Sequence, residues 1–144
     1  MPTPLHETAT RRLRGVQQRY TPGRQALVDI LASAKRPLSI PDILAIDASV
    51  PQSSVYRNLT ALELAGVVRK VQGADEFSRF ELAEDLTGHH HHLVCTSCGT
   101  VDDYTVPSRL ERTMAQAIDE IANETGFRAE FHRLDLLGTC SRCN

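Results

Sequence analysis

The chain has 144 residues and a mass of 16.0 kDa, and 41% of the residues are hydrophobic, so it can bury the core of one or two small domains. Its four cysteines are too few for a scaffold held together by disulfides. No apolar run approaches the length of a membrane span, and the N-terminus lacks the apolar stretch of a secretory signal. We therefore expect a soluble, cytoplasmic protein.

The net charge of −2 hides a difference between the two halves of the chain. Residues 1–83 carry eleven Lys/Arg and eight Asp/Glu, a balance of +3, whereas residues 84–144 carry five and ten, a balance of −5. This asymmetry indicates two parts with different partners. Arginines are densest near the start of the chain, where a solvated, partly disordered leader is the alternative to a nucleic-acid contact.

The first half of the chain predicts three short helices followed by a β-hairpin. The first helix spans about 22–35, because Thr21 is a suitable N-cap, Pro22 suits the first helical position and apolar residues recur at helical spacing. Ser39 and Asp42 resemble a capping box, so we expect a short second helix to begin there.

The third helix is predicted over 51–65, and hairpin strands follow at about 67–71 and 79–82. Three helices followed by a basic hairpin are the order of a winged helix-turn-helix, in which the last helix enters the major groove and the hairpin touches the DNA backbone. A generic small helical domain is the alternative. The outward polar face of the third helix and the basic hairpin residues are Gln52, Ser53, Tyr56, Arg57, Thr60, Arg69, Lys70 and Arg79.

The second half of the chain begins after an acidic linker at 84–88. A short strand then leads into Cys95, and a second strand is predicted at about 100–104. A helix with an apolar stripe follows over 107–125, and a final strand is expected from Phe127 to about Leu137.

Two CxxC pairs are the strongest single signal in the sequence. Cys95 and Cys98 form the first pair, and Cys140 and Cys143 form the second after 41 intervening residues. Four thiolates are the ligands of a closed tetrahedral Zn(II) site, which has no open position for a substrate. We therefore predict one structural zinc per chain, and two redox dithiols or an iron–sulfur cluster are the alternatives.

Four consecutive histidines, residues 89–92, precede the first CxxC pair. In an extended segment, His89 and His91 share one face and His90 and His92 share the other, so the run can serve two metal sites. Imidazole suits Zn, Fe and Ni, and added carboxylates favour harder metals. A solvated histidine stretch is the alternative. Further candidate ligands are Glu81, Asp102, Asp103 and His132.

Enzyme chemistry has little support in the sequence. Ser53 and Ser54 have no evident histidine partner, and there is no nucleophile elbow or phosphate-binding glycine loop. A hydrolytic zinc site needs three protein ligands and an open position, which His90, His92 and a carboxylate could supply. We predict no catalytic residue, and a zinc-dependent enzyme or a redox switch is the alternative of another class.

Several motifs along the chain occur together in one known family. They are Tyr56-Arg57-x-Leu59, Ala65-Gly66-Val67-Val68, Phe80-Glu81-Leu82, the block HHHHLVC-x2-CG and a terminal CxxC. From Arg19 to Cys143 the chain thereby resembles the ferric uptake regulator (Fur) family. The resemblance implies an α+β protein with a winged helix-turn-helix DNA-binding domain at 1–83, a hinge linker at 84–88 and a small α/β metal-binding dimerisation domain at 89–144.

The resemblance also implies a function and three metal sites. Proteins of this kind are homodimeric repressors in which a divalent metal at the hinge closes the DNA-binding domains onto a palindromic operator. The structural zinc ligands are then Cys95, Cys98, Cys140 and Cys143, and the regulatory ligands are Glu81, His90, His92 and Asp103. An additional site is implied at His89, His91 and His132, with Glu111 in place of the glutamate that the family has at Ala115.

Among regulatory metals we favour Fe(II), because Glu81 and Asp103 add two oxygen ligands. Zinc sensing, manganese sensing and peroxide sensing are the alternatives within the family. The chain departs from iron and peroxide sensors at their hinge histidine, since it reads Arg36-Pro37-Leu38 there. A cysteine ligand typical of many zinc sensors is also missing, because all four cysteines are committed.

The DNA contacts are expected in the first half of the chain. The resemblance places Tyr56 at a base-contacting tyrosine with Arg57 beside it, and Arg19 at a basic position that touches DNA. A bidentate arginine contact to a base is worth about 1–3 kcal/mol of discrimination. The remaining candidates are Ser53 and Ser54 at the start of the same helix, and Arg24 and Arg69 as phosphate contacts.

Overall fold

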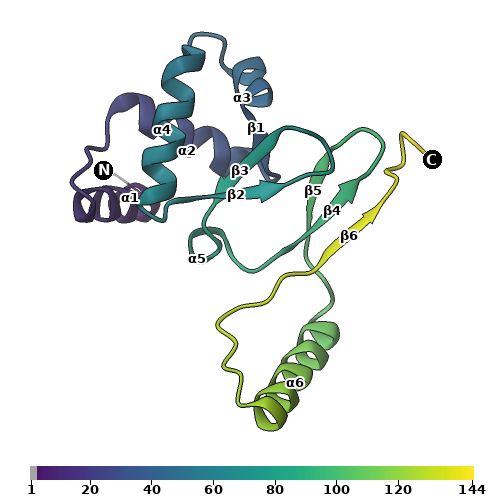
Figure 1. The fold of residues 1–144 in the computed structure, drawn as a ribbon. Coiled ribbons are helices and arrows are strands. Elements are labelled where there is room, and N and C mark those ends of the chain that lie inside the picture. The colour runs from purple at the N-terminus through teal and green to yellow at the C-terminus, as the bar shows by residue number, and fades with distance from the viewer. Residues whose placement is uncertain (1–2) are drawn as a thin grey trace.

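The computed structural model describes residues 3–144 and has an α+β fold with two small sheets (Figure 1). The first part of the chain carries four helices, a short strand and a hairpin, as expected of a winged helix. Its elements are α1 (Pro4–Gly15), α2 (Pro22–Ala34), β1 (Leu38–Ser39), α3 (Ile40–Ile46), α4 (Gln52–Leu64), β2 (Val68–Gln72) and β3 (Ser78–Leu82).

The second part of the chain carries a sheet, one turn of helix and one long helix. Its elements are α5 (Glu84–Thr87), β4 (His91–Cys95), β5 (Val101–Tyr104), α6 (Ser108–Thr125) and β6 (Asp135–Gly138). The predicted helix starts and the hairpin agree with these bounds to within one or two residues. No helix within residues 3–144 is long and apolar enough to cross a membrane.

Helix α1 was not predicted from the sequence, in which this arginine-rich segment indicated either a partly disordered leader or a nucleic-acid contact. The Thr3 side chain caps the helix by accepting from the His6 backbone N–H, and Pro4 occupies the first turn. Ala9 and Leu13 are fully buried against the rest of the first part. The Thr-Pro pair and the apolar spacing of these residues could have predicted the helix.

The capping box at Ser39 and Asp42 is confirmed. The Ser39 backbone N–H donates to Asp42 Oδ2 at 3.0 Å, and the Asp42 backbone N–H donates to Ser39 Oγ at 3.2 Å. This cap begins α3 directly after β1, whose Leu38 pairs with Phe80 of β3. The core of the first part lies between α1, α2, α4 and the sheet ordered β1-β3-β2.

The second sheet has the order β5-β4-β6 and a much smaller buried cluster. Val94 and Val101 from this sheet pack with Val71 from hairpin strand β2, so the hairpin and the second sheet share apolar contacts. The predicted last strand was too long, because residues 127–134 run across from α6 without a strand partner. Only the four residues of β6 pair, in parallel, with β4.

Helix α6 stands apart from both sheets (Figure 1). None of its side chains is buried by the part of the chain that the structure describes, although it is amphipathic. Leu110 and Ile121 of its apolar stripe are exposed, as are Leu136 and Leu137 of β6. The chain therefore presents apolar side chains on α6 and β6 that no other described residue covers.

Candidate metal centres

The four cysteines come together at one end of the second sheet. Cys95 ends β4 and Cys140 follows β6, and the parallel pairing of these strands places Cys95 opposite Gly138. The four sulfur atoms lie within 4.8 Å of one another, and Cys98 Sγ is 3.8 Å from Cys140 Sγ. A tetrahedron with Zn–S bonds of about 2.3 Å has edges of about 3.8 Å, so the cluster fits Zn(II).

The thiol of Cys95 is prepared for metal binding by the backbone around it. The N–H groups of Cys98 and Cys140 each donate to Cys95 Sγ at 3.4 Å. These hydrogen bonds lower the pKa of Cys95 to about 6, and the thiolate is the form that binds zinc. Convergence of all four sulfurs favours one four-thiolate site over two separate dithiols.

A second cluster, which we call the hinge cluster, consists of Glu81, His90, His92 and Asp103. Glu81 comes from hairpin strand β3, whereas the other three come from β4, its preceding residues and β5. Glu81 Oε2 lies 3.0 Å from His90 Nε2 and 3.1 Å from His92 Nε2. Asp103, opposite His92 in the sheet register, has Oδ1 3.6 Å from both Nε2 atoms. The hinge cluster therefore joins the two sheets.

The donor set of the hinge cluster fits a divalent cation. Asp103 Oδ1 is buried and accepts no hydrogen bond from any residue in the range 3–144. Burial raises the pKa of Asp103, although the charges of His90, His92 and Arg69 oppose this rise. Burial opposes ionisation of Glu81 as well, but hydrogen bonds from His92 and His90 and the charge of Arg69 bring its pKa to about 2. Two imidazole nitrogens and two carboxylates could hold Fe(II), Mn(II) or Zn(II).

The third cluster gathers His89, His91, Glu111 and His132. Glu111 lies in the first turn of α6. Its Oε1 lies 3.0 Å from His89 Nε2, and its Oε2 lies 3.1 Å from His132 Nε2. His91 Nε2 also contacts the Glu111 carboxylate. Glu111 thus stands among the three histidines, one turn before Ala115. The histidine run alternates between this cluster and the hinge cluster, as the period of an extended segment predicts.

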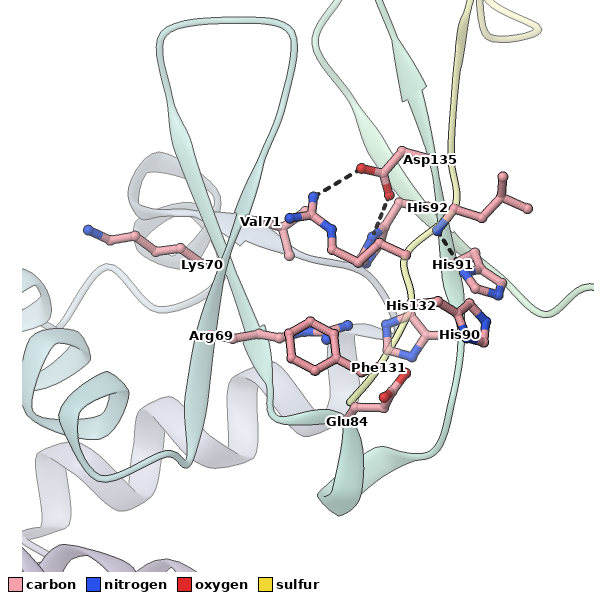
Figure 2. Close-up of a pocket in the computed structure, with 12 residues that line it drawn as sticks. Arg69, Lys70, Val71, Glu84, His90, His91, His92, Phe131, His132 and Asp135 are labelled. Carbon is pink, nitrogen blue, oxygen red and sulfur yellow. Dashed lines mark hydrogen bonds and ion pairs between the residues drawn. The ribbon is translucent and has the colours of Figure 1, made fainter. Parts of the chain in front are cut away.

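Two charged side chains next to the hinge cluster were not predicted as part of it. Arg69 of β2 lies opposite Glu81 and donates to Glu81 Oε1 from Nε at 2.7 Å. Asp135 of β6 lies opposite His92, with Oδ1 3.5 Å from His92 Nδ1 (Figure 2). Such outer contacts orient a metal-binding imidazole or carboxylate. Only strand register reveals them, because both residues are distant in sequence from the ligands that they contact.

The residues proposed for DNA contact fall into two groups in the structure. Tyr56 and Arg57 are exposed on α4, and Arg19 is exposed before α2. Arg24 instead donates to Asn58 Oδ1 at 3.1 Å. It therefore ties the start of α2 to α4 rather than projecting freely. Ser53 is exposed at the start of α4, and Ser54 is half-buried there.

Comparison with known proteins agrees with this architecture. The family model described as "Ferric uptake regulator family" matches residues 15–137. The chain is 33% identical to the ferric uptake regulation protein of Bacillus subtilis over 141 residues, covering 93% of this chain and 91% of that protein. It is 31% identical to the peroxide operon regulator of the same organism over 134 residues, covering 88% and 84%.

A solved structure described as a zinc-bound manganese uptake regulator has the same fold. Its TM-score is 0.67 at 30% sequence identity, and the match covers 96% of this chain and 99% of that one. The names of these relatives refer to iron, peroxide and manganese, so similarity alone does not identify the metal that is sensed. The chain belongs to the ferric uptake regulator family, whose members are DNA-binding transcriptional regulators and not enzymes.

Proposed function

We propose that this chain is a homodimeric repressor that binds a palindromic operator when a divalent metal occupies the hinge cluster. The observation that carries the proposal is the origin of the ligands. Glu81 comes from the winged-helix hairpin, whereas His90, His92 and Asp103 come from the second sheet. One ion bound by all four would therefore hold the hairpin and the second sheet in one arrangement.

The coupling between metal and DNA follows from this placement. A ligand shifts a conformational equilibrium only by its differential affinity for the two states. An arrangement that separates Glu81 from the imidazoles offers fewer ligands, so metal favours the arrangement in which they converge. Because β3 and α4 share the core of the first part, the position of the hairpin also sets the position of the exposed α4 side chains Tyr56 and Arg57.

Fe(II) is the regulatory metal that we favour, and Zn(II) is the structural metal at the cysteines. Two carboxylates beside two imidazoles suit Fe(II) or Mn(II) better than a thiolate-containing set would. Peroxide sensing is a second candidate, supported by the 31% identity to a peroxide operon regulator. Since all four cysteines converge on one site, peroxide would have to act at metal-bound histidine rather than at a free thiol.

A second copy of the chain is the partner that we propose for α6 and β6. Their exposed apolar residues are typical of a surface covered in an oligomer. Dimers with twofold symmetry bind pseudo-palindromic sites, because each protomer reads one half-site. The dimer would therefore present two copies of α4 to successive major grooves.

The test is anaerobic titration of the zinc-loaded protein with Fe(II), Mn(II) and Zn(II) against DNA selected from a random-sequence library. Metal should raise affinity for the selected DNA in the wild type. The double variant His90→Ala/His92→Ala should lose this response while it keeps one zinc per chain and remains a dimer. Equal DNA affinity with and without added metal in the wild type would refute the proposal.

A further inference from the structure

The two carboxylate oxygens of Glu81 have different partners. Oε2 faces the imidazoles of His90 and His92, at 3.0 and 3.1 Å. Oε1 is held by the Arg69 guanidinium, with Nε at 2.7 Å and Nη2 at 2.6 Å. No other residue in the described range donates to Oε1 in this arrangement. Arg69 therefore occupies one oxygen and leaves the other to face the metal ligands.

Burial of Glu81 makes loss of its contact with Arg69 unfavourable. The Glu81 side chain is only 6% exposed, whereas that of Arg69 is 34% exposed at the edge of the cluster. A buried carboxylate oxygen without a hydrogen-bond donor is destabilised, so contact with another positive group lowers its free energy. Without Arg69, a metal in the hinge cluster is the nearest such partner, and both oxygens of Glu81 would turn toward it.

Lys70, the next residue of β2, provides an internal comparison. It carries the same charge but lies on the opposite face of the strand, as alternation requires. Figure 2 shows Lys70 pointing away from the histidines, whereas Arg69 extends toward them. Lys70 is exposed and forms no ion pair with any residue that the structure describes. Lys70 is thus free to reach a phosphate, and Arg69 is engaged by Glu81.

We propose that Arg69 is a positioning residue of the hinge metal site, which holds Glu81 as a single-oxygen ligand, and that Lys70 provides the phosphate contact of the hairpin. This inference rests on the proposed metal-responsive function. It revises the expectation that Arg69 contacts DNA. It also places one residue from each hairpin strand at the site, a ligand from β3 and its positioning residue from β2.

The variants Arg69→Gln and Lys70→Gln test the proposal, because they remove the same charge from adjacent positions. Co(II) is added anaerobically to zinc-loaded protein, and its d–d absorption reports coordination number. Arg69→Gln should shift this spectrum toward higher coordination, because both oxygens of Glu81 then face the metal. Lys70→Gln should leave the spectrum unchanged. Retained zinc and absence of thiolate-to-Co(II) charge-transfer bands show that the cysteine site is intact.

A purely electrostatic role of Arg69 predicts an unchanged Co(II) spectrum. Removing a nearby positive charge would then tighten cation binding without changing the Co(II) spectrum, and that outcome would overturn the proposal. Arg69→Lys separates the two effects further. It keeps the charge but loses the guanidinium geometry, so it should show the altered spectrum although the positive charge is retained.

DNA binding provides the second readout, measured on random-sequence DNA without regulatory metal. Lys70→Gln should flatten the dependence of log affinity on log salt by about one unit, whereas Arg69→Gln should match the wild type. A flattened slope for Arg69→Gln with a wild-type Co(II) spectrum would assign Arg69 to a phosphate contact and refute the inference.

If the wild type responds to metal and Arg69→Gln behaves identically in both measurements, only this inference fails. If the wild type takes up no second metal, the proposed function fails with it.

Discussion

A proton and a metal ion compete for the imidazole of His90 in the hinge cluster. Burial opposes the charged imidazolium, but the hydrogen bond with Glu81 and the charges of Glu81 and Asp103 raise the pKa of His90 above its ordinary value. The ionised Glu81 thus stabilises a proton on His90 when no metal is bound. A metal that takes Nε2 must displace that proton.

Metal affinity at the hinge cluster should therefore increase with pH. Because the pKa of His90 is raised above its ordinary value of 6.5, the neutral ligand form becomes dominant only as pH rises through that raised value. Mn(II) affinity measured by calorimetry at pH 6.5, 7.5 and 8.5 should rise at each step, with proton release at the lower pH values. The same affinity at all three values would contradict this linkage.

The hairpin between β2 and β3 is the element that connects the winged helix to the loop that follows Cys98. Asp75 in its turn accepts from Arg79 Nη1 at 2.6 Å and Nη2 at 2.9 Å, and Arg79 is only 6% exposed. This carboxylate lies directly against Gly99, whose φ is +80°. A Cβ at Gly99 would come within 2.1 Å of Asp75 Oδ2. The glycine therefore permits both the loop conformation and the close approach of the hairpin.

Gly99→Ala should destabilise the protein more than Gly126→Ala does. Both glycines have positive φ, at +80° and +72°, but a Cβ at Gly126 would meet nothing within 4 Å among the described residues. Gly126→Ala should therefore cost about 1–2 kcal/mol for left-handed backbone alone. Gly99→Ala adds the clash with Asp75. Urea unfolding of the two zinc-loaded variants compares them, and equal losses would show that the hairpin contact contributes nothing.

At the scale of the whole molecule, the second part of the chain leaves the apolar side chains of α6 and β6 uncovered. Its buried cluster includes Val94 and Val101, joined by Val71 from the hairpin, so a metal bound by the four cysteines would supply much of its order. Helix α6 meets the rest of the chain at its first turn through Glu111, while the Ile121 side chain farther along it is 49% exposed. A second copy covering α6 would complete the fold.

Ile121→Asp should dissociate the proposed dimer, whereas Gln116→Asp should not. Both substitutions place a carboxylate on α6. Ile121 belongs to the apolar stripe, whereas Gln116 lies on the polar face of the helix. A twofold interface repeats the charge, so the dimer dissociation constant should rise by about 100-fold or more. Analytical ultracentrifugation of the zinc-loaded variants measures this, and a dimer unaffected by Ile121→Asp would place the interface elsewhere.

Local signals were enough for most elements of the fold. The capping box at Ser39, the N-cap at Thr21 and the hairpin depend on residues a few positions apart, so short stretches of chain encode them. The CxxC spacing and the alternation of the histidine run are equally local. Even α1, which was missed, carries its own start signal at Thr3 and Pro4.

Partnerships between distant segments depended on tertiary structure. Strand register places Arg69 opposite Glu81 and Asp135 opposite His92, and no sequence pattern predicts that register. The start of α6 brings Glu111 to the histidines, although it lies a turn before the expected position. The composition suggested DNA binding from the positive half of the chain, but only packing distinguishes Arg24 and Arg69, which are bonded within the fold, from the exposed Lys70. Charge is a property of sequence, whereas the partner of a charge depends on which strands and helices meet.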